Sequence, residues 1–229
     1  MPDMISNAIW VWMDCRSSRL FGFSLNILAM ARELAAATGG QAVACVLAPK
    51  GGIHLSASEG DACGPEASVE TACLSHGADQ VLVLEHDRLT PPRADLFAHA
   101  LCEAVRTAAP RLVLAALTDF GRELAARAAR HCRAGLIADC QDITIDDAGR
   151  IVGVCPAWGG NSWWASCRPY SIPKTPFCHL GQMYRPIGQI SIRMSTTISL
   201  HSIVGIAHMK QGIISGKTLR TLRAVTDAA

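Results

Sequence analysis

The stretch LVLAALTDFGRELAARAARHCRAGLIADCQDITIDD, residues Leu112 to Asp147, decides the fold. It begins with an apolar run, Leu112 to Leu117, which is too short for a typical helix and is typical of a buried strand. Thr118 and Asp119 follow, and both are favoured residue types at a helix N-cap. Gly121 then allows the backbone to turn tightly. This order predicts a strand that passes through a short turn directly into a helix.

The second half of the stretch predicts that helix and one more strand. The segment from about Arg122 to Cys132 is rich in Ala, Arg and Leu, which favour helices, and its small residues recur at helical spacing. Gly135 predicts the end of the helix, and Leu136 to Ile145 predicts the next strand. The unit of strand, turn, helix and strand indicates two parallel strands joined by a crossover.

The same alternation occurs earlier in the chain. Ser24 is a candidate N-cap for the first of the preceding helices, and Arg16 to Phe21 is expected to form a turn before it. The expected strands cover residues 8–13, 41–48 and 80–85, and the expected helices cover residues 25–37, 66–75 and 94–108. Strands that alternate with helices in this way predict a doubly wound α/β domain with a mainly parallel sheet.

Candidate binding residues lie where the strand of the central unit ends. Ligands of open α/β sheets bind beyond the carboxyl ends of the strands, and a helix N-terminus there attracts phosphate. Gly121 and Arg122 are therefore candidates for cofactor binding. The alternative is a structural turn, in which Arg122 pairs with a neighbouring carboxylate or a partner subunit. His76 also resembles a catalytic residue in type, but a cap or packing role at a helix end is the expected one.

Charge is distributed unevenly along the chain. Residues 1–147 contain 18 acidic and 12 basic residues, a balance of −6, whereas residues 148–226 contain no carboxylate and nine basic residues. Arg outnumbers Lys by 17 to 4, which is typical of a GC-rich bacterial genome. The abrupt change predicts a boundary, and we expect a folded domain over residues 1–168 and a poorly structured, basic C-terminal tail over residues 169–229.

Cysteine usage and hydropathy limit the class of protein. Ten Cys occur without a C-x-x-C pair, and most of them, including Cys102 and Cys132, lie in apolar periodic segments. This pattern predicts small buried thiols in a cytoplasmic protein rather than a metal site. The N-terminus is not typical of a secretory signal, and no run of 18 apolar residues predicts a membrane span. We also expect no catalytic residues of a self-contained enzyme, and no nucleic-acid partner.

Two motifs carry a resemblance to a known family. The segment TDFGRELAARAARHCRAGLIADC, from Thr118 to Cys140, resembles a motif in the N-terminal domain of the electron transfer flavoprotein alpha subunit. The sequence departs from that pattern at Leu117, Glu123 and Ala126, where the family has a small residue, Asp and Pro. The segment Pro156-Ala-Trp-Gly-Gly-Asn161 is similar to the family's Pro-Ala-Phe-Gly-Gly-Asn, and the resemblance covers roughly residues 9–168. The positions that match the first motif are Gly121, Arg122, Leu124, Ala125, Arg127, Gly135, Leu136, Asp139 and Cys140.

The resemblance implies a fold, a cofactor and partners. The implied fold is like that of the adenine nucleotide alpha hydrolases. The implied cofactor is FAD, which relays electrons from dehydrogenases to a quinone reductase or other acceptors within a heterodimer with a beta subunit. Trp158, Gly159, Gly160 and Asn161 are implied to face that partner. The redox chemistry of such a protein belongs to the flavin, so the chain is expected to be an electron carrier.

The family's second domain, which holds most of the FAD contacts, is not recognisable in residues 169–229. This tail is either a functional basic segment or a degraded or frameshifted remnant of the FAD domain, and its lack of carboxylates and periodicity favours the second. We therefore expect the chain alone to bind FAD weakly or not at all. The alternative function is a stand-alone α/β module that binds a nucleotide or a partner without redox activity.

Overall fold

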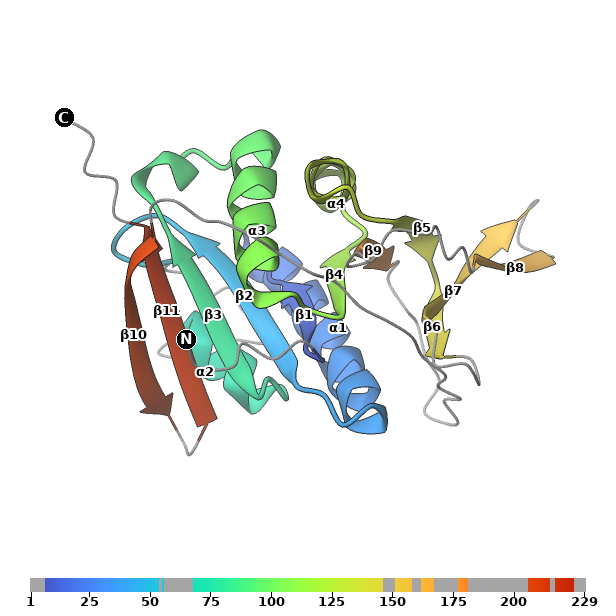
Figure 1. Ribbon diagram of the computed structural model, residues 1–229, viewed down its shortest axis with the longest axis horizontal. Helices are drawn as coiled ribbons and strands as arrows, with labels where there is room; N and C mark the ends of the chain where they lie inside the picture. Colours follow the sequence, from blue (N-terminus) through green and yellow to red (C-terminus); the bar gives the residue numbers. More distant parts are fainter. Residues whose placement is uncertain are drawn as a thin grey trace.

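The structure, a computed structural model, describes residues 7–53, 55, 68–145, 151–157, 162–166, 177–180, 206–214 and 217–224. Strands and helices alternate from β1 to β5, as the sequence predicts (Figure 1). The helices are α1 (Ser18–Ala37), α2 (Val69–Ser75), α3 (Ala94–Ala108) and α4 (Asp119–Cys132), with a short 3-10 helix, η1 (Asp87–Leu89). The strands are β1 (Ile9–Trp12), β2 (Ala42–Ala48), β3 (Gln80–Glu85), β4 (Leu112–Ala116), β5 (Leu136–Cys140), β6 (Asp142–Ile145), β7 (Ile151–Ala157), β8 (Ser162–Ser166), β9 (Phe177–Leu180), β10 (Ile206–Ile214) and β11 (Lys217–Ala224).

The main sheet has the doubly wound order that the sequence predicts. Its strands lie in the order β10-β11-β3-β2-β1-β4-β9-β5, and every neighbouring pair is parallel except β10 with β11. The register places Ile9 of β1 opposite Ala42 on one side and opposite Leu112 on the other. The chain moves outward from β1 through β2 to β3 and then returns to add β4 on the opposite side of β1. The order therefore reverses between β1 and β4, which is where such folds bind ligands.

Two apolar cores cover the two faces of this sheet. One face packs against α1 and α2, and the other packs against α3 and α4 (Figure 1). Successive residues of β1 point to opposite faces, so Ile9 enters the first core and Trp10 the second. This burial on both faces explains why the central strands are continuous apolar runs rather than alternating ones.

Helix α1 begins earlier than the sequence predicts. Ser17, not Ser24, is its N-cap, and its Oγ accepts a hydrogen bond from the amide of Leu20. Ser24 lies inside the helix and is buried, where its Oγ accepts from the amide of Asp14 at 3.0 Å and donates to the carbonyl of Leu20. Most of the expected turn over residues 16–21 is therefore the first turn of the helix. Ser24 can lie inside the helix because its hydroxyl is hydrogen-bonded to Asp14, which precedes the helix.

Helix α1 is also the one described helix that is long and apolar enough to cross a membrane. Its buried residues include Leu25, Leu28, Ala31 and Leu34, and they face the sheet. Core packing thus accounts for the apolar residues on that side of the helix.

The predicted strand over Leu136 to Ile145 is two strands in two sheets. β5 ends the main sheet, whereas β6 begins a second, antiparallel sheet with the order β6-β7-β8. Gln141 separates the two strands, and within β5 the register with β9 shifts between Ile137 and Cys140. Asp139 lies at that irregularity, and its φ of 55° is in the left-handed region that Asp tolerates better than most residues. The preceding helix α4 ends at Cys132, as the sequence predicts, but its C-cap is Arg133, which is left-handed with a φ of 51°, and not Gly135.

Part of the expected irregular tail forms strands. β9 lies between β4 and β5, and β11 pairs in parallel with β3, with Thr218 opposite Gln80. The sequence of β11, KTLRTLRA, lacks a strand period, but the free edge of β3 supplies hydrogen-bond partners for its backbone. The rest of residues 169–229 lies outside the described part of the chain, so the domain boundary at residue 168 stays a prediction.

The structure corrects the expectation for one pair of cysteines. Cys102 of α3 and Cys132 of α4 form a disulfide, with Cα atoms 5.8 Å apart, instead of remaining buried thiols. The two helices pack side by side (Figure 1), which brings together residues 30 positions apart in a way that the spacing does not reveal. Within the described residues, the cysteines that form no disulfide are Cys15, Cys45, Cys73, Cys140 and Cys155, and no group of three or more His, Cys, Asp or Glu could hold a metal ion.

Candidate functional site

Charged, polar and aromatic side chains meet where β1 and β4 end. Asp14 and Arg16 follow β1, and Thr118 and Phe120 follow β4. We call these four residues, together with Trp12 of β1, the switch-point cluster. Because the strand order reverses between β1 and β4, this edge of the sheet is the expected ligand position of the fold.

Asp14 is the centre of the cluster. It is fully buried, and its carboxylate accepts hydrogen bonds from Nε and Nη2 of Arg16 at 2.8 and 2.7 Å. The hydroxyl of Thr118 donates to the same carboxylate at 3.4 Å, while its oxygen accepts from the amide of Gly121 at 2.9 Å. The N-cap of α4 and the charge after β1 are therefore connected through a single side chain, that of Thr118.

An aromatic ring lies against the guanidinium of Arg16, and two further rings pack on that ring. It lies 4.1 Å from the ring centroid of Phe120, close enough for a cation–π contact. Phe120 stacks on Trp12 at 5.8 Å and meets Phe97 of α3 edge-on at 5.6 Å. Arg16 thus contacts both the ring of Phe120 and the carboxylate of Asp14.

These residues do not fit the pyrophosphate of FAD. The buried charge at this edge is a carboxylate, which repels phosphate, and Arg16 already neutralises it. The Gly121 amide at the start of α4 already donates its hydrogen bond to the hydroxyl oxygen of Thr118. Asp119 adds a negative charge in the first turn of that helix. The favourable field of the helix N-terminus is therefore already used by the protein's own groups.

Gly121 lies next to the cluster, and the structure explains why a glycine stands there. It is buried in the first turn of α4, and a Cβ atom on it would lie 2.1 Å from the carbonyl oxygen of Ala116. The close approach of α4 to β4 thus requires a residue without a side chain, whereas the sequence suggested that backbone freedom was the reason.

Arg122 points elsewhere. It pairs with Asp139 of β5 at 3.1 Å, and both side chains are 53% exposed. This contact with a neighbouring carboxylate is the alternative that the sequence left open. A cofactor role for Gly121 and Arg122 stays a prediction.

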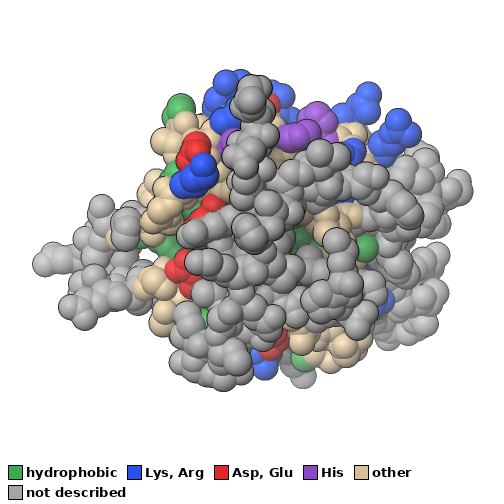
Figure 2. All heavy atoms as spheres, turned by 60° about the vertical axis from the view of Figure 1, so that its left-hand side comes forward, with side chains coloured by type: hydrophobic (Ala, Val, Ile, Leu, Met, Phe, Trp, Pro, Cys, Tyr) green, Lys and Arg blue, Asp and Glu red, His purple; other side chains and the backbone are tan. Residues whose placement is uncertain are grey.

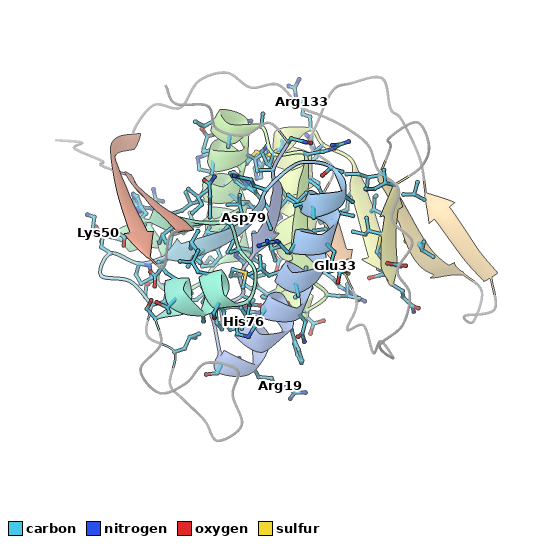
Figure 3. All side chains as sticks on the ribbon, turned by 90° about the horizontal axis from the view of Figure 1, so that it is seen from below. Arg19, Glu33, Lys50, His76, Asp79 and Arg133 are labelled. Carbon is cyan, nitrogen blue, oxygen red and sulfur yellow. A yellow bond between two sulfur atoms is a disulfide. The ribbon has the colours of Figure 1, made fainter. Side chains whose placement is uncertain are left out.

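His76 has the structural role that the sequence favours. It is the C-cap residue of α2 (Figure 3). Its Nδ1 lies 2.8 Å from the carbonyl oxygen of Ala72. A carbonyl can only accept a hydrogen bond, so this ring nitrogen is the donor. Nearby, Arg32 of α1 pairs with Asp79 at 3.2 Å, and Asp79 accepts from the amide of Ala42. These contacts tie α1, β2 and the start of β3 together.

The expected partner-facing residues, Trp158, Gly159, Gly160 and Asn161, lie outside the described residues. They connect β7 and β8, which are described and form an antiparallel pair at the far end of the molecule from β10 (Figure 1). The face drawn in Figure 2 shows basic and His side chains along its upper rim and acidic side chains below, so its described part carries both signs of charge.

The sequence interpretation missed Asp14, Arg16 and Phe120. The signal that was available is an Asp directly after a buried apolar strand, followed two residues later by Arg. The cation–π contact had no such signal, because Phe120 follows a different strand, more than a hundred residues along the chain.

Comparison with known proteins agrees with this architecture. The sequence model of the electron transfer flavoprotein domain matches residues 10–168, which run from β1 to just beyond β8. The chain belongs to the electron transfer flavoprotein domain family. The match thus confirms the resemblance that the two sequence motifs carried, over nearly the same residues.

Curated relatives of this family member include alpha-type subunits. The electron transfer flavoprotein subunit alpha of Thermoanaerobacterium thermosaccharolyticum is 30% identical over 179 residues, which cover 78% of this chain and 50% of the relative. Protein FixB of Rhizobium meliloti is 27% identical over 192 residues, 80% of this chain and 50% of the relative. The acryloyl-CoA reductase electron transfer subunit beta of Anaerotignum propionicum is 29% identical over 139 residues, 60% of this chain and 34% of the relative. The chain spans about half the length of the curated relatives it matches, or less.

Proposed function

We propose that this chain is the N-terminal α/β part of an alpha-type subunit of an electron transfer flavoprotein. In this role it is a platform that docks a beta-type subunit, and the FAD is held largely by other parts of the complex. The family match over residues 10–168 and the relatives named as alpha subunits support this proposal. The chain is then an electron carrier's scaffold, and the redox chemistry is that of the flavin.

The observation that carries the proposal is the closed switch-point cluster. A domain that binds a nucleotide by itself presents free amides and a cation at this edge of the sheet. Here the cation, Arg16, is engaged by a fully buried carboxylate and by the ring of Phe120. The position that would bind phosphate is therefore filled by a structural ion pair, which suits a scaffold better than a cofactor site.

The second sheet supports docking of a partner. β7 and β8 extend from the end of the molecule opposite β10, and the residues between them are those that resemble the family's partner-facing motif (Figure 1). We infer that a beta-type subunit contacts this hairpin through Trp158 and its neighbours Gly159, Gly160 and Asn161.

Copurification and flavin absorbance together test the proposal. The chain should be colourless when purified alone, and it should form a stable complex when it is produced with a beta-type subunit. Trp158→Ala should weaken that complex. Trp10→Phe, a change of a Trp in the buried core, is the control and should leave the complex unchanged, because the Trp10 side chain faces α3 and α4. A chain that forms no complex with any beta-type subunit would contradict the proposal, whereas a complex without flavin would favour the partner-binding module.

Titration with FAD tests the role of the cluster itself. With one helix N-terminus and one engaged Arg, we expect millimolar affinity, about −4 kcal/mol, for the chain alone. Asp14→Asn should raise that affinity, because it releases Arg16 from its carboxylate. Asp95→Asn, an exposed change in a carboxylate that pairs with Arg93, should leave it unchanged. A stoichiometric yellow complex of the unmodified chain would show that the described edge is not the whole flavin site and would overturn the scaffold role.

A further inference from the structure

Two cysteines that form no disulfide lie close together at the junction of the two sheets. Cys140 is the last residue of β5 and is fully buried, whereas Cys155 belongs to β7 and is partly exposed. Their sulfur atoms are 3.5 Å apart, although 15 positions separate them in the sequence. Cys155 also donates a hydrogen bond from Sγ to the carbonyl of Ala138 in β5 at 3.1 Å.

Backbone contacts on both sides fix this juxtaposition. The amide of Gln141 donates to the carbonyl of Val154 at 2.8 Å, and these residues are the sequence neighbours of the two cysteines. One position further from Cys155, Gly153 lies so close to β5 that a Cβ atom on it would be 2.6 Å from Sγ of Cys140. The thiol pair is thus held by the β6–β7 ladder and by close packing of β5 on β7, and not by two flexible surface side chains.

We propose that Cys140 and Cys155 form a redox-active dithiol that closes to a disulfide between the main sheet and the second sheet. Closure needs an approach of the two sulfurs by about 1.5 Å, to the bonding distance of about 2.05 Å, which side-chain rotation can supply. The oxidant is a low-molecular-weight disulfide. One thiol loses its proton and attacks that disulfide, which releases one small thiol and leaves a mixed disulfide. The second cysteine then loses its proton and displaces the other small thiol, so two electrons and two protons leave the pair.

The surroundings of the pair make this a slow reaction at neutral pH. Burial raises the pKa of the Cys155 thiol to about 12, and Cys140 and the carboxylate of Asp139 add to the increase. Asp139 itself forms an ion pair with Arg122 of the adjacent helix α4. The thiolate is the attacking species. As long as the pH is below that pKa, the rate should therefore rise about tenfold for each unit by which the pH increases.

The consequence of closure is a rigid joint between the sheets. Without the bond, side-chain and backbone contacts alone hold β7 against β5. With it, the strand that leads into residues 158–161 is anchored covalently to the main sheet. That these residues meet a partner rests on the proposed function, whereas formation of the disulfide does not.

Peptide mapping after oxidation tests the proposal. The full chain is incubated with oxidised glutathione, its remaining thiols are alkylated, and the protein is digested with trypsin without reduction. Cleavage after Arg133, Arg150 and Lys174 places Cys140 in the peptide 134–150 and Cys155 in the peptide 151–174. We expect these two peptides to be linked, with the loss of two hydrogen atoms. The disulfide between Cys102 and Cys132 gives a different pair of peptides and is an internal control.

Variants identify the bond. The peptide 151–174 also contains Cys167, so Cys167→Ser should keep the link and Cys155→Ser should abolish it. Oxidation should raise the melting temperature by about 5–10 °C in the unmodified chain and not in Cys155→Ser, as expected for a bond that closes a loop of this length. Cys140→Ser should also abolish the link, and Cys155→Ser provides the same test if the buried Cys140 variant does not fold. Absence of the linked peptides, or their persistence in Cys155→Ser, would overturn the proposal.

Discussion

Replacement of Gly121 by Ala tests how closely α4 packs against β4. The added methyl carbon would lie 2.1 Å from the carbonyl oxygen of Ala116 and 3.1 Å from Oγ1 of Thr118. Ordinary van der Waals contact begins at 3.4 Å, so the first turn of the helix must move away from the strand by more than an ångström. The obstacle is backbone of β4, which is hydrogen-bonded on both sides within the sheet and cannot yield as a flexible side chain would.

The magnitude follows from what that movement disturbs. It strains the N-cap bond from the Gly121 amide to Thr118, which is worth about 1 kcal/mol. It also disturbs the packing of Leu124 and Ala128, which are fully buried, at a cost of about 1–3 kcal/mol. The higher helix propensity of Ala offsets about 0.5–1 kcal/mol of this loss. We therefore expect Gly121→Ala to lower the free energy of unfolding by about 1–3 kcal/mol, and Gly121→Val to lower it further.

Urea unfolding with Gly22→Ala as a matched control provides the assay. Gly22 also lies inside a helix, α1, but a Cβ atom on it would meet nothing within 4 Å. Gly22→Ala should therefore raise the midpoint, because Ala stabilises a helix interior by about 0.5–1 kcal/mol relative to Gly. The two variants should shift the midpoint in opposite directions without a change in the slope. If Gly121→Ala is as stable as Gly22→Ala, the close contact between α4 and β4 does not exist and the reasoning is wrong.

Three further predictions concern charged and ionisable groups. Arg16→Ala should lower the free energy of unfolding by about 2–4 kcal/mol because it leaves the Asp14 carboxylate buried without its Arg16 partner. Asp14→Asn should lower it less, by about 1–2 kcal/mol, because the Arg16 side chain is 28% exposed and can reach water. The reverse order in urea unfolding would contradict the assigned burial. Arg122→Ala should change stability by less than about 1 kcal/mol, since its ion pair with Asp139 is exposed; a larger loss in the same assay would mean that the pair is buried against something else. Burial raises the pKa of Cys45 to about 12, above its value of about 8.5 in the unfolded chain. The contribution of this thiol to the free energy of unfolding is therefore fully present below about pH 8.5 and is lost as the pH rises toward 12. Stability should thus fall less steeply between about pH 8 and pH 10 in Cys45→Ala than in the unmodified chain, and equal slopes would count against this burial effect.

Local patterns were sufficient for most of the α/β framework. The apolar runs of β1 to β4 exceed what an exposed strand would carry, and the helices between them have clear apolar stripes. Helix α3 begins and ends at the residues that the sequence predicts, because a strong amphipathic pattern lies between Arg93 and Pro110. The two motifs around Gly121 and Asn161 were specific enough to indicate the family.

Boundaries failed where a distant residue satisfies a local group. Ser24 is a residue type favoured at an N-cap, but it lies inside α1, where its hydroxyl oxygen accepts a hydrogen bond from the amide of Asp14. The pattern of Leu136 to Ile145 predicts one strand, but the segment divides at Gln141 because its two halves pair with different partners, β9 and β7. The short apolar β9 gave no signal of its own, and its place between β4 and β5 depends on the free edges of those strands.

The sites themselves are decided by tertiary structure. The order of the sequence places Asp14 after β1 and Phe120 after β4. Only the parallel pairing of those two strands brings the Arg16 guanidinium over the Phe120 ring at that edge of the sheet. The same holds for Cys140 and Cys155, whose sulfurs meet because a ladder folds the chain back on itself. Local sequence determines which segments become strands and helices, since propensity and burial act over a few residues. Contacts between residues far apart in the chain depend on how those segments pair, and no local sequence pattern determines which segments pair.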